Sequence, residues 1–368
     1  MRRAVLWTLL TLCLYLAAEA ALFRTGFYFR FVEPNSTTGN LESALYWLRH
    51  TPVNPRGEVA VFGDSRVAEG FSAPIATATI QNRLAFRNLS VPGMSLRNWF
   101  YLLRDADPAR NRFRAIVLTL ERYADNDSYD SPPDRIRDIR YSLGRLRLAD
   151  CLDFPFTMTL PENRQAALTG CLLKGVPLRP DLAEFLRNPR QRIQEARASR
   201  QHGLEWNSAY TGIERNMVGL EVDLPRNTIV RFPPNVDSGV QVSLRQSILP
   251  ERPPDAGVTT EYRKLWLGRL MDLYRGTSTK FVFVEMPRAP ISIPEDPTPP
   301  RFIRSVQGQR GVAVLPAFTF RDLETPETFG DGLHLNAKGR VEFSKRLAGF
   351  VEAILAGSGS GASSGATK

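Results

Sequence analysis

Five short apolar runs, each bounded by charged or turn residues, constrain the fold of this chain more than any other feature. They read EVAVF (58–62), AFRNL (85–89), RAIVLTLE (114–121), TKFVFVEMP (279–287) and GVAVLP (311–316). Runs of this length that are apolar through the middle are typical of strands covered on both faces, and AFRNL, which contains Arg87 and Asn88, is a weaker strand signal than the others. Helical patterns lie between them, and strands that alternate with helices indicate a parallel sheet. We therefore predict an α/β fold with three layers (α/β/α) around a parallel sheet of about five strands.

The strand signals divide the chain into segments. Residues 57–124 and 256–355 form two halves of one α/β domain, separated by a mainly helical insertion over residues 125–255. Scattered prolines in the insertion make a single long helix improbable. Residues 26–56 read as a linker with one short helix around 41–49. The Gly- and Ser-rich residues 356–368 read as a flexible tail.

The N-terminal residues 1–25 carry an apolar segment behind a basic start. Ala4 to Phe23 is apolar apart from threonines and Glu19, and about 20 apolar residues span a bilayer. Arg2 and Arg3 predict that this end stays in the cytoplasm and that the rest is exported. The segment is either an uncleaved anchor or a signal peptide cleaved near Ala18-Glu19-Ala20. The aromatic stretch FRTGFYFRF, typical of a membrane interface, favours the anchor.

The net charge of +10 does not by itself indicate a nucleic-acid partner. The arginines are scattered among acidic residues, and the chain has no zinc-finger or RNA-binding signature. It also lacks a Walker loop and a Gly-x-Gly-x-x-Gly motif, so no nucleotide cofactor is expected. The cysteines have no C-x-x-C spacing and the histidines are far apart, so no metal site is expected.

Cys151 and Cys171 form the only cysteine pair outside the N-terminal segment, which contains Cys13. In an exported protein they either form a disulfide or remain as two buried thiols, and we slightly favour the disulfide. A bridge across about 20 residues stabilises a fold by about 3 kcal/mol in the loop-entropy model.

Two polar motifs follow the first and the last predicted strands. Gly63-Asp64-Ser65 ends the first strand, and Asp331 and His334 lie in FGDGLHLNAKG, before the last helix. The carboxyl ends of parallel strands meet at one edge of the sheet, where ligand sites form. A serine needs a base within hydrogen-bond reach, and His334 with Asp331 supplies a base and its orienting carboxylate. Each motif alone is a common turn, but together they predict a shared site.

These motifs resemble the SGNH (GDSL-type) hydrolase superfamily. The resemblance rests on Gly63-Asp64-Ser65, on Gly93 in NLSVPGMS and on DGLHLNAKG, and covers residues 57–122 and 259–355. It implies a flavodoxin-like α/β/α fold with Ser65 as nucleophile, His334 as base and Asp331 as its orienter. The backbone N–H groups of Ser65 and Gly93 are then expected to bind the oxyanion.

The third family motif differs in this chain. The family usually has Gly-x-Asn-Asp after the third strand, whereas this chain has LTLERYADND. Either Asn126 is a displaced oxyanion donor, or another group replaces it, or the enzyme is slow; one lost donor costs about 100-fold to 1000-fold in rate. Arg66, beside the nucleophile, either binds an anionic or sugar substrate or forms a salt bridge.

Membrane-anchored relatives with the GDSR form resemble polysaccharide-modifying proteins of the bacterial envelope. The resemblance therefore implies an O-acetyltransferase or esterase that uses an acetyl donor and a carbohydrate acceptor. It also implies a single pass through the bacterial inner membrane, a periplasmic catalytic domain and contacts with polysaccharide synthesis or export proteins. Two alternatives stay open: a non-catalytic envelope protein that binds glycan or a partner, and a lipid esterase.

Overall fold

The structure is a computed structural model, and it describes residues 1–120, 136–202, 209–234, 236–249, 259–294 and 301–357. The chain divides into two compact units. The helical unit comprises Met1–Thr51, Phe100–Ala106 and the described part of Pro133–Leu204. The sheet unit comprises Pro52–Trp99 and the described parts of Asp107–Pro132 and Glu205–Lys368.

The sheet unit contains five parallel strands in the order β2-β1-β3-β6-β7. The strands are β1 (Glu58–Phe62), β2 (Ala85–Asn88), β3 (Phe113–Leu120), β6 (Lys280–Glu285) and β7 (Val312–Val314). Their register pairs Val59 with Phe86 of β2 and with Ala115 of β3. The predicted α/β class and the five-strand parallel sheet are confirmed, with strand ends close to those read from the apolar runs.

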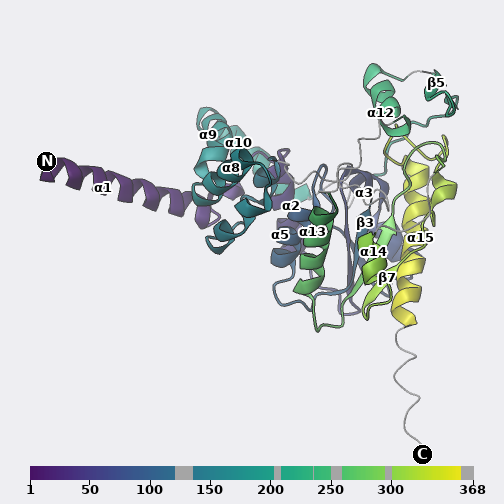
Figure 1. The fold of residues 1–368 in the computed structure, drawn as a ribbon, viewed down its shortest axis with the longest axis horizontal. Helices are drawn as coiled ribbons and strands as arrows, with labels where there is room; N and C mark the ends of the chain where they lie inside the picture. The colour runs from purple at the N-terminus through teal and green to yellow at the C-terminus, as the bar shows by residue number, and fades with distance from the viewer. Residues whose placement is uncertain (121–135, 203–208, 235, 250–258, 295–300, 358–368) are drawn as a thin grey trace, which may run out of the picture. The chain divides into compact units, whose positions relative to one another are not determined.

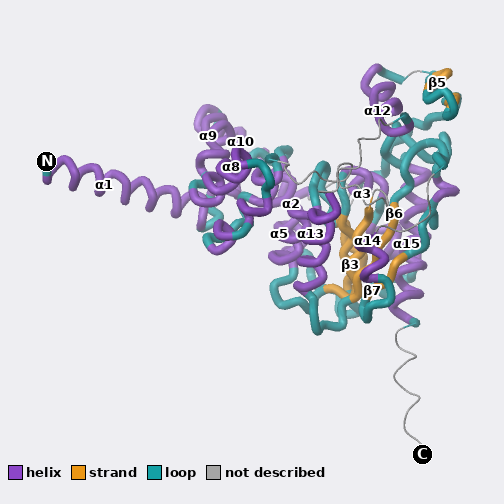
Figure 2. The backbone as a smooth tube through the Cα atoms, in the orientation of Figure 1, coloured by secondary structure: helices purple, strands orange, loops and turns teal. Residues whose placement is uncertain are grey.

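Helices cover both faces of this sheet. The helices of the sheet unit are α3 (Ser65–Gly70), α4 (Ala73–Thr79), the first turn of α5 (Leu96–Ala106), α12 (Ser238–Ile248), α13 (Thr259–Leu273), α14 (Arg301–Val306), η5 (Arg321–Leu323) and α15 (Ala337–Ala356). Val59, Val61 and Val117 face a core formed with α3, α4 and α15. Alternate residues point to the opposite face, where Phe62 packs near Trp99. Figure 1 shows α13 and α15 on opposite sides of the sheet, which is drawn in orange in Figure 2.

The helical unit is built around the N-terminal residues. Its elements are α1 (Arg2–Glu19), the π-helical turn η1 (Ala20–Arg24), η2 (Tyr28–Arg30), α2 (Thr37–His50), the remainder of α5, α7 (Asp138–Ser142), η3 (Ala149–Leu152), η4 (Phe154–Thr157), α8 (Pro161–Leu172), α9 (Gly175–Arg187) and α10 (Pro189–His202). The short helix expected around 41–49, within the segment 26–56 read as a linker, is present as α2, and its Leu41, Leu45 and Leu48 are buried. An amphipathic helix gains most of its stability by burying such a face.

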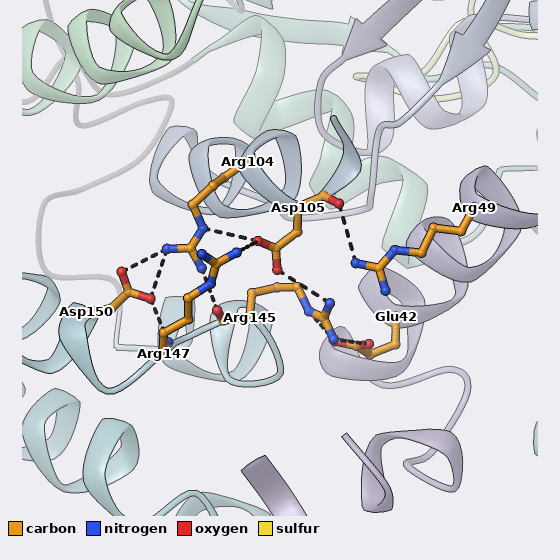
Figure 3. A network of polar contacts seen from close by, with 7 residues as sticks. All are labelled: Glu42, Arg49, Arg104, Asp105, Arg145, Arg147 and Asp150. Carbon is orange, nitrogen blue, oxygen red and sulfur yellow. Dashed lines mark hydrogen bonds and ion pairs between the residues drawn. The ribbon is translucent and has the colours of Figure 1, made fainter. Parts of the chain in front are cut away.

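Cys151 and Cys171 form the expected disulfide, with Cα atoms 5.5 Å apart. The bridge joins η3 to α8. Beside it, Arg104 binds both carboxylate oxygens of Asp150 at 2.8 and 2.9 Å. Arg145 binds Glu42 through two hydrogen bonds of 2.7 and 3.0 Å (Figure 3). These ion pairs tie α2 and the end of α5 to the residues around 145–150.

The insertion contributes to both units. Its first described part supplies α7 to α10, and Asn188-Pro189 ends α9 and begins α10, as expected for a proline at a first helical position. Its second part lies in the sheet unit and supplies α12. This second part also contains an antiparallel pair, β4 (Glu221–Asp223) with β5 (Thr228–Arg231), which the sequence interpretation did not include.

The N-terminal helical stretch Arg2–Arg30, which begins with α1, is long and apolar enough to cross a membrane. The apolar side chains of α1 are exposed, whereas Glu19 and Phe23 at its far end are buried. An N-terminal signal sequence can meet the same criteria of length and apolar composition.

Candidate active site

The turn after β1 holds Ser65 at the first residue of α3. The Asp64 side chain caps this helix by accepting a hydrogen bond of 2.9 Å from the backbone N–H of Arg66. Gly63 is needed for close packing, because a Cβ there would lie 2.2 Å from Val67 Cγ2 and 2.6 Å from Thr119 Oγ1. The glycine therefore lets the strand turn sharply into the helix beneath Ser65.

Asp331 and His334 lie in the loop between β7 and α15. One carboxylate oxygen of Asp331 accepts the backbone N–H groups of Leu333 at 2.7 Å and His334 at 2.8 Å. The other oxygen lies 2.8 Å from His334 Nδ1. His334 Nε2 lies 2.9 Å from Ser65 Oγ. The structure thus brings together the three residues that the sequence analysis singled out.

The protonation states of Asp331 and His334 follow from their hydrogen bonds and from the charges around them. Burial opposes ionisation of Asp331, but hydrogen bonds from the His334 ring and from two backbone N–H groups lower its pKa below the ordinary value. A carboxylate only accepts, so the neutral imidazole carries its proton on Nδ1 and leaves Nε2 to accept from Ser65. This is the tautomer that a general base requires.

His334 is also tuned toward its charged form. Burial works against the imidazolium, yet the hydrogen bond and charge of Asp331, with the charges of Glu69 and Asp64, raise the pKa of His334. The ring therefore accepts a proton more readily than an isolated histidine.

Arg66 forms the salt bridge that was one of its two expected roles. Its guanidinium lies 3.1 Å from Asp64, and the residue is buried. Although desolvation of the half-buried Asp64 opposes its ionisation, this cation lowers the pKa of Asp64. Arg66 thus holds the turn that carries Ser65, and the pair gives no support to the expectation that Arg66 binds substrate.

The residues expected at the oxyanion site have different outcomes. Gly93 is half-buried and has φ of +70°, in a turn where the Met94 N–H donates to Val91 at 3.0 Å. That φ lies in the left-handed region, which explains a glycine there. Asn126 lies outside the described residues, as do the other residues of the altered third motif from position 121 on.

A segment from the insertion braces the loop that carries Asp331 and His334. The Ala337 N–H donates to Ile213 O at 2.8 Å, and Met217 N–H donates to Pro326 O at 2.7 Å. Arg215 Nε donates to Gly330 O at 2.8 Å. Sequence reasoning missed these contacts, because two of the three are backbone bonds that leave no mark on side-chain pattern.

A second group supports α3. The Tyr210 hydroxyl donates to Glu69 at 3.3 Å, and the Arg340 guanidinium lies 4.9 Å from the centre of the Tyr210 ring. Asn88, fully buried at the end of β2, donates through its amide to Val67 O at 3.2 Å and Phe71 O at 3.1 Å. In the sequence, the polar Asn88 at the end of an apolar run is the one sign of these supporting contacts that could have been noticed.

The site lies at the point where sheet order reverses. Numbered in chain order, the five strands lie in the order 2-1-3-4-5. The chain passes from β1 to its neighbour β2 on one side, and then crosses to β3 and continues to β6 and β7 on the other side. Ligands bind at the carboxyl ends of strands flanking such a point, and Ser65 follows β1 directly. Among the described residues, no group of three or more His, Cys, Asp or Glu side chains is placed to hold a metal ion.

Comparison with known proteins assigns no family. The chain matches no protein-family model and no curated protein.

Proposed function

We propose that this protein is an exported serine acyl-ester enzyme, a hydrolase or an O-acyltransferase, that acts on acetyl esters of an envelope or extracellular polysaccharide. The observation that carries the proposal is the continuous hydrogen-bonded chain from Ser65 Oγ through His334 to Asp331. A serine hydroxyl becomes a useful nucleophile when a base at this distance takes its proton. The substrate class rests on the resemblance to SGNH hydrolases.

The proposed reaction has two steps. Ser65 Oγ attacks the carbonyl carbon of the acyl donor while His334 Nε2 takes the hydroxyl proton, and Asp331 stabilises the imidazolium. The tetrahedral intermediate expels the alcohol, which receives that proton from His334, and an acyl-serine ester remains. Water or a sugar hydroxyl then attacks this ester as His334 takes its proton, and the proton returns to Ser65 when the acyl group leaves. The backbone N–H groups of Ser65 and Gly93 are the proposed oxyanion donors.

We further propose that α1 is an uncleaved anchor in the bacterial inner membrane, with the remaining chain in the periplasm. Cleavage near Ala18-Glu19-Ala20 would remove Glu19, whose carboxylate accepts the Gly175 N–H at 3.1 Å at the start of α9. Nearby, Arg24 donates to the carbonyls of Cys171 and Leu172 at 2.8 and 2.7 Å, at the end of α8. Anions stabilise helix N-termini and cations stabilise helix C-termini, so the end of α1 is built into the helical unit.

The test is intact-mass measurement of the full chain in detergent after treatment with a fluorophosphonate. We expect one adduct on the wild-type chain, none on Ser65→Ala and labelling slowed at least 100-fold in His334→Ala. Ser278→Ala, which removes an exposed serine from the turn before β6, serves as the matched control and should label normally.

Absence of an adduct on the folded wild-type chain would refute the enzyme proposal and favour the glycan- or partner-binding alternative. An adduct accompanied by preference for long-chain over acetyl esters would favour the lipid esterase. The mass of the untreated chain purified from cells also reports whether α1 has been removed.

A further inference from the structure

The helical unit contains a cavity of about 600 Å³ beside the end of α1. The segment that follows α1 forms one wall, and α2, Gly144 and α10 form the others. Its ionisable lining is strongly basic: five arginines face one carboxylate, that of Glu42. The arginines are Arg24, Arg30, Arg49, Arg145 and Arg200.

The single carboxylate is already engaged. Arg145 binds both oxygens of Glu42 and lies 3.5 Å from Asp105 (Figure 3). The charge of Glu42 is therefore compensated by Arg145.

Three other arginines of the lining, Arg30, Arg49 and Arg200, form no ion pair with a carboxylate among the described residues. Arg49 donates to the Asp105 backbone carbonyl at 3.4 Å, and Arg200 donates to the Arg30 carbonyl. Burial, and after it the charge of Arg30, lower the pKa of Arg200, while Tyr46 and Glu42 act in the opposite direction.

The cavity lies where a membrane-spanning α1 would leave the bilayer. The helix runs from Arg2 to Glu19 and continues as η1 to Arg24, and about 20 residues cross the hydrocarbon core. Arg24, a lining residue, then lies at headgroup level. Phe27, which is half-exposed and packs edge-on against Phe31, suits the same interface.

We propose that this cavity binds the phosphate of an anionic phospholipid headgroup from the membrane that holds α1. Guanidinium groups match phosphate oxygens through paired hydrogen bonds, and basic groups near a bilayer favour anionic lipids. A cavity of this volume is in the range of small-molecule sites. The inference rests on the anchor part of the proposed function, and commits to a lipid because the lining begins at the exit of α1.

The test uses the full chain in detergent and native mass spectrometry. Binding of dioleoylphosphatidylglycerol is compared with that of dioleoylphosphatidylcholine, which has the same acyl chains and no net charge. The wild-type chain should prefer phosphatidylglycerol, and Arg30→Gln with Arg200→Gln should weaken its binding by about 30-fold. Arg190→Gln with Arg197→Gln, two exposed arginines of α10 that do not line the cavity, should retain the preference.

Equal binding of the two lipids by the wild-type chain would overturn the proposal, as would a preference that survives the double substitution in the cavity. Inorganic phosphate bound as tightly as phosphatidylglycerol would also overturn it, in favour of a soluble ligand. Fluorophosphonate labelling of the same samples separates the two proposals. Labelled Ser65 without lipid preference refutes the cavity alone, and lipid preference without labelling refutes the enzyme alone.

Discussion

The hydroxyl of Ser65 lies beside Nε2 of His334, and Asp331 keeps this nitrogen unprotonated by binding the ring proton at Nδ1. The ionised Asp331 keeps the proton of His334 on Nδ1, and the acidic groups around the ring raise the pKa of His334. The protonation of His334 is therefore set by the few charged groups around its ring.

The raised pKa of His334 predicts a pH dependence. Only the neutral ring takes the Ser65 proton, so labelling of Ser65 should increase with pH through a midpoint above the ordinary histidine value of 6.5. Stability follows the opposite trend. Because folding raises this pKa, the bonded imidazolium stabilises the fold fully below the ordinary value, and this contribution is lost as pH rises through the raised one.

Asp331→Asn tests the origin of that midpoint. The amide removes the negative charge, so the midpoint should move to lower pH, and the labelling rate at its plateau should fall by about 1,000-fold to 10,000-fold. Labelling-rate profiles of the two chains between pH 5 and pH 9 measure both effects. An unchanged midpoint would show that Asp331 does not set the pKa of His334.

At the scale of elements, the Asp331–His334 loop depends on a segment far away in sequence. The parallel bridge between Ile213 and Asn336 brings this segment against the start of α15. Gly212, with φ of +110°, lies so close that a Cβ would be 2.8 Å from Ala337 Cα. His334 is positioned by this packing as well as by its own loop.

Gly212→Ala should therefore slow Ser65 labelling and lower the free energy of unfolding by about 1–3 kcal/mol. Gly276→Ala is the matched control, since Gly276 also has positive φ, +82°, but nothing lies within 4 Å of its would-be Cβ. The control should show only backbone strain, with an unchanged labelling rate. Equal labelling rates in both variants would argue against the bracing role. Chemical denaturation and labelling kinetics measure the two effects.

At the scale of the whole molecule, the chain forms two units with separate sources of stability. The sheet unit relies on a large apolar core, whereas the helical unit adds a disulfide and the ion pairs around Arg104 and Arg145. Damage to one unit should therefore be measurable apart from the other.

Replacing both Cys151 and Cys171 with Ala should destabilise the helical unit by about 3 kcal/mol through loss of the closed loop. Hydrogen exchange followed by peptide mass analysis should show faster exchange in α8 and α9. Exchange in β1 and β3, and labelling of Ser65, should remain as in the wild-type chain. Faster exchange across the sheet would mean that the two units unfold together.

The strands could be predicted from sequence because their signals are local. The run EVAVF predicts β1 over the residues that the structure assigns, since an apolar stretch between charged residues has one way to be buried. The motifs at Ser65 and at Asp331-His334 could be paired in advance, because parallel strands end at a common edge. The likeness to SGNH hydrolases and the acetyl-ester chemistry remain predictions.

The sequence by itself determined the α/β class, the parallel sheet and an N-terminal helix apolar enough for a membrane. Only the tertiary structure decided that α2 belongs to a helical unit, that Arg66 is paired with Asp64 and that Ile213 braces the loop of His334. It also gathered the arginines of the cavity from distant segments. The physical reason is range: apolar periodicity acts within a few residues, whereas ion pairs and backbone bonds between distant segments depend on the closed fold.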